Sequence, residues 1–297
     1  MVQAGERNVF DQRWLEYELL EKYDSILWTN EMLNFRFSIH VIRLTFDELA
    51  QRASVDPTSS ALLVDHCIEI STVYFRAGYT PTDFPTVSQY ETRFLLEKSR
   101  AIKCPSIPLQ LAGGKKVQQV LSDPGVLERF LRDEKKYDQV LSQEQVVEIR
   151  SSWMGMWGLD LGGPEGTGLL RAKERFQSLV LKPQREGGGN NVYKEAIPSF
   201  LENLPEQERQ AWIAMELIVP PEGLQGYLIR GGGTDTVKTD VASELGIFGW
   251  TLFGGEKRQV LQEKEVGWLV RTKGKDSNEG GVATGFSVLD SVVLVDA

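Results

Sequence analysis

The sequence predicts an α/β protein in which helices flank a sheet. Three observations lead to this prediction. Helix-like and strand-like segments alternate over the first hundred residues, capping boxes mark helix starts within that run, and glycine-rich connections separate short apolar strands in the second half. With 297 residues, the chain is long enough to bury a sizeable core without disulfides, as one large or two modest domains.

The composition excludes several classes of protein. It is 41% hydrophobic and 25% charged, and its net charge of −9 comes without a Lys/Arg block, which argues against nucleic-acid binding. No apolar run is long enough to cross a membrane, and the N-terminus lacks the apolar core of a signal peptide. The separated cysteines Cys67 and Cys104 indicate a reducing, cytoplasmic compartment. His40 and His66 have no serine or cysteine partner in a recognisable motif, so triad chemistry is unsupported.

The first helix is predicted over residues 9–23, because apolar side chains recur there at helical spacing and glutamates take the other face. Its apolar side chains are Phe10, Trp14, Leu15, Leu19 and Leu20. Residues 39–46 alternate in the manner of a half-buried strand. A short helix should follow, because Thr45 and Glu48 have the spacing of a capping box.

Two strands are predicted next, LLVD and IEISTVYF, followed by a loop rich in glycine and proline. A second capping box, Ser88 with Glu91, predicts a helix with Tyr90, Phe94 and Leu95 on one face. This run completes the alternating pattern of the first hundred residues.

The second half is predicted to begin with helices and to end in strands. A glycine-preceded helix is expected at LAGGKKVQQVL, with further helices to about residue 150 and a glycine-rich link over residues 158–168. A strand, a loop and a helix from about Glu195 should follow. The later strands are WIAMELIV, QGYLIR, IFGWTLF and VGWLVRT.

The first glycine stretch, residues 180–194 (VLKPQREGGGNNVYK), combines charge with loose backbone. The three glycines Gly187–Gly189 have no Cβ, so the backbone can approach a ligand and direct its N–H groups at phosphate oxygens. Lys182 would place a cation near those phosphates, and Glu186 is an oxygen ligand suited to Mg²⁺. The stretch matches neither common phosphate-loop motif, and a flexible connector is the alternative.

The second glycine stretch, residues 270–285, contains Arg271 and Lys273 two positions apart. On a strand these cations face the same side, and an anion between them would relieve their repulsion. Residues 280–283 could offer backbone N–H donors. The alternative is a solvated edge strand followed by a loop.

Two further stretches are candidates for binding. Arg76 follows an apolar strand and residues 78–79 open a loop, and strand ends in α/β sheets are common ligand sites. A hydrogen-bonded arginine with a core tyrosine is the alternative. Residues 6–12 (ERNVFDQ) place polar groups ahead of a helix, although Asn8 or Asp11 could simply cap it.

Taken together, these stretches resemble eukaryotic-type glutathione synthase over nearly the whole chain. The matching segments are ERNVFDQR, VYFRAGYTP, KCPSIPLQLAGGKKVQQVL, VLKPQREGGGNN, SELGIFG and LVRTKGKDSNEGGVATGFSVLD. Several long, unusual segments in the right order are more specific than any one glycine loop. The resemblance implies an ATP-grasp fold with a lid at about 155–235. It places a smaller parallel-sheet substrate-binding domain at 1–107 and the ATP-grasp portion at 108–297.

The resemblance also implies a reaction. ATP and Mg²⁺ would drive the ligation of γ-glutamylcysteine and glycine through an acyl phosphate, giving glutathione, ADP and phosphate. In such a transfer the protein supplies positioning and charge neutralisation, which agrees with the lack of a nucleophile motif. A cytoplasmic homodimer that acts on small molecules is expected, with neither nucleic acid nor membrane as a partner.

The resemblance assigns residues to both sides of the site. On the nucleotide side they are Lys115, Lys182, Glu186, Gly187, Gly188, Gly189, Asn190, Asn191, Tyr193, Met215, Glu216, Leu217, Ile218, Glu244 and Lys273, with Glu186 as the magnesium ligand. On the substrate side they are Glu6, Arg7, Asn8, Gln12, Arg76, Ala77, Gly78, Tyr79, Arg271, Glu279, Val282 and Ala283. Arg271 and Lys182 are the expected catalytic cations.

The sequence departs from the family pattern in two places. Family members have a substantial portion ahead of ERNVFDQ that supplies further magnesium ligands, so an N-terminally truncated form is expected. Residues 24–38 are an apolar insert, which we interpret as retained intron-derived sequence. These departures leave open an alternative function, a catalytically incompetent fragment that binds nucleotide, glutathione or a full-length partner subunit. A third option is a ligase with another acceptor, against which Val282 and Ala283 favour glycine.

Overall fold

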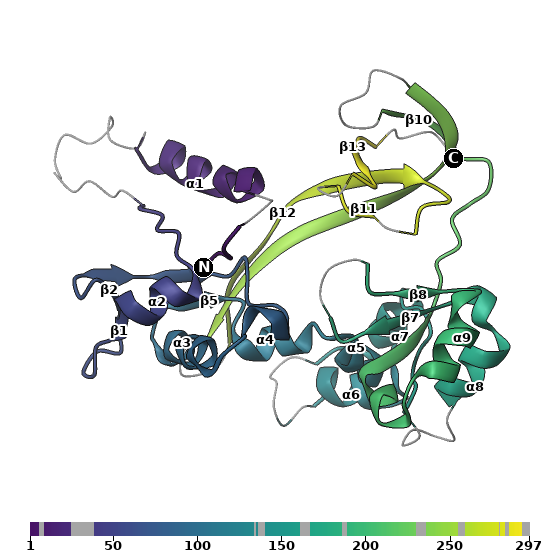
Figure 1. The fold of residues 1–297 in the computed structure, drawn as a ribbon, viewed down its shortest axis with the longest axis horizontal. Helices are drawn as coiled ribbons and strands as arrows, with labels where there is room; N and C mark the ends of the chain where they lie inside the picture. Colours follow the sequence, from purple (N-terminus) through teal and green to yellow (C-terminus); the bar gives the residue numbers. More distant parts are fainter. Residues whose placement is uncertain are drawn as a thin grey trace. The chain divides into compact units, whose positions relative to one another are not determined.

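The computed structural model describes residues 1–5, 9–24, 39–133, 135, 140–160, 167–185, 189–229, 236–254, 259–278, 280–282 and 285–292. The chain divides into two compact units. The first unit consists of Met1–Leu170, Lys182–Glu186 and Leu204–Ala214. The second unit consists of Arg171–Leu181, Gly187–Asn203 and Met215–Ala297. Figure 1 draws the helices and strands of both units and labels most of them.

The N-terminal part of the first unit alternates helices with short strands (Figure 1). Its elements are α1 (Val9–Asp24), α2 (Phe46–Arg52), β1 (Ala53–Val55), β2 (Leu62–Val64), β3 (Ile68–Ile70), β4 (Thr72–Tyr74), α3 (Val87–Lys98) and β5 (Ile102–Cys104). Strands β1, β2 and β3 form an antiparallel sheet, and β4 pairs with β5 in parallel. The predicted strand IEISTVYF is therefore two strands in two different sheets.

One hydrophobic core holds these elements together. Its buried members are Leu44, Phe46, Leu49, Leu62, Val64, Val73, Phe75, Leu96 and Ala101. They come from α2 and the segment before it, from β2, β4 and α3, and from the residues that follow β4 and precede β5. Burial of this apolar surface is the main stabilising contribution, and it positions the loop that follows Phe75.

The predicted start of α2 is confirmed and the strand predicted before it is wrong. Thr45 accepts the Glu48 N–H (3.3 Å) and donates its own N–H to the Glu48 carboxylate (2.8 Å), a complete capping box. Residues 39–45 belong to no strand. The capping box and the burial of Phe46 and Leu49 in helix α2 override the alternating pattern.

Helix α3 (Val87–Lys98) is present, but its predicted cap is wrong. The helix begins at Val87 after Thr86, whose N–H donates to the Gln89 side chain (3.0 Å), so Ser88 lies inside the helix. Its buried residues are Gln89, Thr92, Arg93 and Leu96. Tyr90 and Phe94 are exposed, because they lie on the face of the helix opposite these buried residues. Tyr90 instead stacks against Phe84, with ring centroids 4.7 Å apart.

The predicted first helix is also present as α1, and its apolar side chains face outward. Phe10 is 81% exposed and Trp14 is 66% exposed. Its ion pair between Arg13 and Glu16 is local to the helix (2.6 Å). No helix among the described residues has the length and the apolar character needed to span a bilayer.

Four helices follow in the first unit, as predicted from the glycine-preceded segment onward. They are α4 (Ile107–Ala112), α5 (Lys115–Ser122), α6 (Val126–Leu131) and α7 (Gln143–Ser151). Arg150 of α7 ties this helix to α6, because its guanidinium donates to both Glu128 carboxylate oxygens (2.6 and 2.7 Å). It also donates to the carbonyls of Ser122 (3.0 Å) and Asp123 (3.1 Å).

This ion pair predicts a pH dependence of stability. The hydrogen bonds from Arg150 lower the pKa of the Glu128 carboxyl to about 2. Because the unfolded chain has the ordinary glutamate pKa of about 4.3, the pair stabilises the fold above that pH and its contribution is lost as the pH falls toward 2. We expect the melting temperature of Glu128→Gln to fall less steeply than that of the wild type between about pH 5 and pH 2. Calorimetric melting curves with equal pH slopes would contradict this.

The middle of the chain forms a sheet with the order β6-β9-β7-β8. Its strands are β6 (Met156–Gly158), β7 (Leu179–Pro183), β8 (Val192–Tyr193) and β9 (Trp212–Glu216), with helices α8 (Thr167–Glu174) and α9 (Ala196–Asn203) between them. The strand before the first glycine stretch and the helix after it are confirmed. The sequence did not predict α8, because its first residues belong to the glycine-rich link of residues 158–168, which was interpreted as a loop.

The C-terminal part of the second unit is a four-stranded antiparallel sheet with the order β10-β11-β12-β13 (Figure 1). Its strands are β10 (Gln225–Ile229), β11 (Thr236–Gly254), β12 (Gln259–Gly274) and β13 (Val288–Asp290). Strands β11 and β12 are much longer than the predicted IFGWTLF and VGWLVRT. At Arg271, β12 pairs with Glu244 of β11 and with Leu289 of β13, so the edge-strand alternative does not hold there.

Candidate functional site

The loop of residues 76–80 follows β4 in the first unit and is fixed by one carboxylate. The N–H groups of Gly78, Tyr79 and Thr80 all donate to Asp83 Oδ2, at 3.1, 2.8 and 3.1 Å. The Tyr79 hydroxyl donates to the Phe75 carbonyl (2.7 Å), which closes the loop over the buried end of the strand. A carboxylate that accepts three backbone donors makes a rigid loop. Nothing in the sequence marks Asp83 for this role beyond its place in the loop.

The predicted substrate residues of the first unit occupy different environments. Ala77 is buried, and the Arg76 N–H donates to the Met1 carbonyl (2.9 Å). Gln12 of α1 is buried and accepts a hydrogen bond from Arg43 (2.7 Å). The predicted residues Glu6, Arg7 and Asn8 lie outside the described residues.

Gly78 is the position in this loop where an added side chain would crowd its neighbours and strain the backbone. Its φ is +88°, and a Cβ there would lie 3.1 Å from the Phe46 ring. We expect Gly78→Ala to lower the free energy of unfolding by about 2 kcal/mol, from left-handed backbone strain and from crowding against Phe46. Urea denaturation measures this loss.

Gly125→Ala is the matched control, because Gly125 has a φ of +79° and nothing within 4 Å of the added Cβ. It should cost about 1 kcal/mol, the backbone contribution alone. Equal losses at Gly78 and Gly125 would show that the contact with Phe46 does not matter.

The predicted phosphate lysines of the first unit lie on two elements that meet. Lys115 begins α5 and donates to Gln118 (2.9 Å), and Lys182 is half-buried in β7. The N–H of Lys116 donates to the side chain of Gln184 (2.7 Å), so the start of α5 lies beside the residues that follow Lys182. Two cations and the N-terminus of a helix are thereby placed around one end of β7, a suitable arrangement for an anion.

Sequence reasoning missed Lys116, Gln184 and Asp160 in this region. Lys116 pairs with Asp160 (2.8 Å), and a Cβ at Gly158 would lie 2.3 Å from that carboxylate. Two sequence features could have drawn attention to this region. Lys116 is the second lysine of a Lys-Lys pair, and Gln184 is a glutamine inside the first glycine stretch. Neither residue type has a periodicity or a motif of its own, and only the folded chain brings them together.

In the second unit, the two glycine stretches lie against each other. The Asn191 amide donates to the Tyr193 hydroxyl (3.1 Å), and that hydroxyl donates to the carbonyl of Asn278 (3.2 Å). Gly189 is exposed and has the left-handed φ of +83°, and Asn190 beside it is half-buried. The predicted residues Glu186, Gly187, Gly188, Glu279 and Ala283 lie outside the described residues.

Arg271, predicted for the substrate side, lies opposite Glu244, predicted for the nucleotide side. Arg271 and Glu244 are direct cross-strand partners on β12 and β11, and their side chains form an ion pair. Lys273 lies two residues along the same side of β12, opposite Ala242. Between them, Thr272 points to the other face, where it donates to Asp290 (2.6 Å) and so lowers the pKa of that carboxyl. The prediction that Arg271 and Lys273 share one side of a strand is confirmed.

The remaining predicted residues of the second unit lie at the ends of elements. Met215 and Glu216 finish β9, and Glu216 lies 3.7 Å from Arg175. The N–H of Leu217 donates to the Ser178 carbonyl (2.9 Å), whereas Ile218 is 73% exposed. The carbonyl of Val282 accepts the Gly285 N–H (3.0 Å) in the turn that ends the second glycine stretch. After β9 the Leu217 N–H is therefore already engaged, and Ile218 presents apolar surface to solvent.

The part of the chain that the structure describes contains no group of three carboxylate, imidazole or thiol side chains arranged to hold a metal ion. Glu186, the predicted ligand, is not among those residues. A shallow depression on the β11–β12 ribbon is lined by residues 247–251 and 263–265, none of which belongs to the predicted site.

Comparison with known proteins identifies the family. Residues 10–294 match the family model described as eukaryotic glutathione synthase, ATP binding domain. The chain belongs to the eukaryotic glutathione synthase family. The predicted fold class and the resemblance drawn from the sequence are therefore confirmed.

Glutathione synthetases from distant organisms are similar to this member of the glutathione synthase family. It is 40% identical over 292 residues to the glutathione synthetase of Homo sapiens and 36% identical over 296 residues to that of Dictyostelium discoideum. It is 38% identical over 298 residues to the chloroplastic glutathione synthetase of Solanum lycopersicum. These alignments cover 98 to 99% of this chain but 48 to 57% of the relatives. The chain therefore spans about half the length of the curated relatives it matches.

A solved structure has the same fold. A glutathione synthetase-like effector from Globodera pallida, in its apo form, superposes with a TM-score of 0.64 at 23% identity. The superposition covers 96% of this chain and 53% of that one. This likeness supports a glutathione synthase-like fold for the described elements.

Proposed function

We propose that this chain acts as a glutathione synthase, an ATP-dependent carbon–nitrogen ligase that joins γ-glutamylcysteine to glycine. The observation that supports this most strongly is the family match over residues 10–294, which includes both glycine stretches. Contact between these stretches through Tyr193 and Asn278 adds to it, because a nucleotide site and a substrate site must adjoin for phosphoryl transfer.

On the nucleotide side, we assign the phosphates of ATP to Lys115, Lys182 and the glycine triad. Cations and backbone donors at the end of β7 suit these charges. The segment after β9, Met215–Ile218, would receive the adenine, with Asn190, Asn191 and Tyr193 nearby. Lys273 and Glu244 complete the nucleotide side. Magnesium, held at Glu186, would neutralise phosphate charge.

On the substrate side, we assign the dipeptide to the 76–80 loop, Gln12, Arg271 and the second glycine stretch. The carboxylate of γ-glutamylcysteine attacks the γ-phosphorus of ATP, and ADP leaves as the acyl phosphate forms. The glycine amine then attacks the acyl carbon, phosphate leaves, and the amine loses a proton. The nucleophiles belong to the substrates, so Lys182 and Arg271 act by neutralising charge as it develops.

The domain boundaries and the assembly are part of the same proposal. Residues 1–107 would bind substrate, residues 108–297 would form the ATP-grasp portion, and the lid would run from about 155 to 235. We place the protein in the cytoplasm as a homodimer, without a nucleic-acid or membrane partner. Cys67 and Cys104 are both exposed, unpaired thiols, which fits a reducing compartment. A chloroplastic relative shows that compartments vary within the family.

A second candidate function is binding without turnover, of nucleotide, of glutathione or of a full-length partner subunit. The observation that favours it is that the chain spans about half the length of the relatives. A ligase must supply every group that the transition state requires, whereas a binding protein needs only part of them.

An assay of ADP release separates the two candidates. A ligase releases ADP only when γ-glutamylcysteine and glycine are both present, and it forms glutathione in equal amount. A binding protein gives a calorimetric titration with ATP and Mg²⁺ but no ADP under any combination of substrates. ADP release that is independent of glycine would contradict the ligase.

A further inference from the structure

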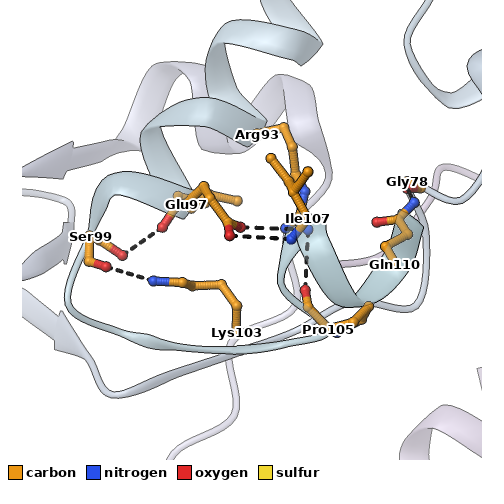
Figure 2. Close-up of polar contacts among 9 residues, drawn as sticks. Gly78, Arg93, Glu97, Ser99, Lys103, Pro105, Ile107 and Gln110 are labelled. Atoms are coloured by element: carbon orange, nitrogen blue, oxygen red, sulfur yellow. Dashed lines mark hydrogen bonds and ion pairs between the residues drawn. The ribbon is translucent and has the colours of Figure 1, made fainter. Parts of the chain in front are cut away.

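Helix α4 is anchored at its start by two polar side chains of α3, the buried Arg93 and the half-buried Glu97 (Figure 2). The Ile107 N–H donates to Glu97 (3.2 Å), and Glu97 lies 3.7 Å from the Arg93 guanidinium. Arg93 is 5% exposed, donates to the Pro105 carbonyl (3.1 Å), and places its guanidinium 3.7 Å from the centre of the Phe75 ring. A helix of six residues is not stable alone, so these contacts determine where α4 lies.

From that anchored position, α4 reaches the 76–80 loop through one side chain. The Gln110 amide donates to the Gly78 carbonyl (2.6 Å), as Figure 2 shows. The Gly78 N–H is already bound to Asp83 (3.1 Å). Both peptide groups of this glycine are therefore fixed, one by Asp83 and the other by Gln110.

The other end of α4 leads directly to the predicted phosphate lysines. The helix ends at Ala112, two glycines follow, and Lys115 begins α5. The next N–H, of Lys116, donates to Gln184 (2.7 Å). One short helix thus joins the loop assigned to the dipeptide with the segment assigned to the phosphates, within the first unit.

We propose that α4 is a positioning element and that Gln110 is the residue through which it sets the 76–80 loop for γ-glutamylcysteine. This inference rests on the proposed function. Without the Gln110 amide, the Gly78 carbonyl loses its donor and the loop samples other backbone conformations. Dipeptide affinity then falls, because the loop must be ordered on binding. Nucleotide affinity does not change, since the Gln184 contact and the lysines remain.

The test uses the full chain with Gln110→Ala and Gln110→Glu, the second of which keeps the size of the side chain and removes the donor. Gln143→Ala is the matched control, because Gln143 is an exposed glutamine of α7 that accepts from Arg132 (2.6 Å). Calorimetric titrations with γ-glutamylcysteine and with ATP and Mg²⁺ give the two affinities. Hydrogen exchange of the amides of residues 78–80 gives the order of the loop without any ligand.

We expect both Gln110 variants to weaken dipeptide binding about tenfold, the loss of one hydrogen bond and of loop order, with nucleotide affinity within about twofold. Loop amides should exchange about tenfold faster, while Gln143→Ala changes nothing. Unchanged dipeptide affinity, or an equal loss for dipeptide and nucleotide, overturns the proposal. If the wild type binds no dipeptide, the proposed function fails, and loop exchange alone then decides: unchanged exchange in Gln110→Ala overturns the positioning role.

Discussion

Replacing Arg93 by alanine is expected to lower the free energy of unfolding by about 3 kcal/mol, the cost of removing one member of a buried charged network. The guanidinium is buried between the Phe75 ring, the Pro105 carbonyl and Glu97. Burial lowers the pKa of Arg93, and the Glu97 carboxylate opposes that shift. The substitution removes the cation–π contact and leaves the Glu97 carboxylate without its nearest cation. Urea unfolding of the purified variant measures the loss.

Arg100→Ala is the matched control for this prediction. Arg100 also forms an ion pair, with Glu69, but both side chains are about half exposed. A surface pair contributes about 0 to 1 kcal/mol, so this variant should unfold within 1 kcal/mol of the wild type. If the two arginine variants lost equal stability, burial of Arg93 would not be the cause.

Replacing Arg271 by methionine is expected to lower the rate of glutathione formation about 100-fold, which is typical for removing one group that stabilises transition-state charge. Arg271 is placed by β12 and by its ion pair with Glu244, so its guanidinium is already oriented before substrate binds. Nucleotide affinity should change by less than about threefold, because the lysines at β7 remain. The measurements are kcat and KM for each substrate.

Two controls isolate the role of Arg271. Lys264→Met removes an exposed cation from the same strand, outside the predicted site, and should leave the rate unchanged. Glu244→Gln keeps the shape of the partner and removes its charge, so it should cost less than Arg271→Met. A rate loss in Lys264→Met equal to that in Arg271→Met would mean that net charge, rather than position, is responsible.

Local signals account for what the sequence predicted correctly. The capping box of Thr45 and Glu48 depends on neighbours three residues apart, so it could be recognised in the sequence and is present in the structure. The two glycine stretches and Arg76 were also recognised as contiguous motifs, and their roles in binding stay predictions. The strand predicted at residues 39–46 was wrong. Alternation of apolar and polar residues does not reveal whether a partner strand exists, and among the described residues no strand pairs with this segment.

What the sequence could not predict depends on contacts between distant residues. The length of β11 and β12 follows from their mutual pairing, and the Glu244–Arg271 pair follows from that register. The contact of Gln110 with Gly78 spans 32 residues, and that of Lys116 with Gln184 spans 68 residues. Glutamine has no spacing rule that marks it as a positioning residue. Such contacts become visible only when the core has placed α3, α4 and α5.

The most direct test of this account is a calorimetric titration of the folded, purified chain with ATP and Mg²⁺, in the wild type and in Lys182→Met. We expect saturable binding of one nucleotide per chain, weakened about 100-fold in Lys182→Met by loss of a charge-assisted contact. The ligase requires that nucleotide site, and so does a chain that binds nucleotide without turnover. A folded wild-type chain that takes up no ATP, or a Lys182→Met variant that binds it as tightly as the wild type, would contradict the account.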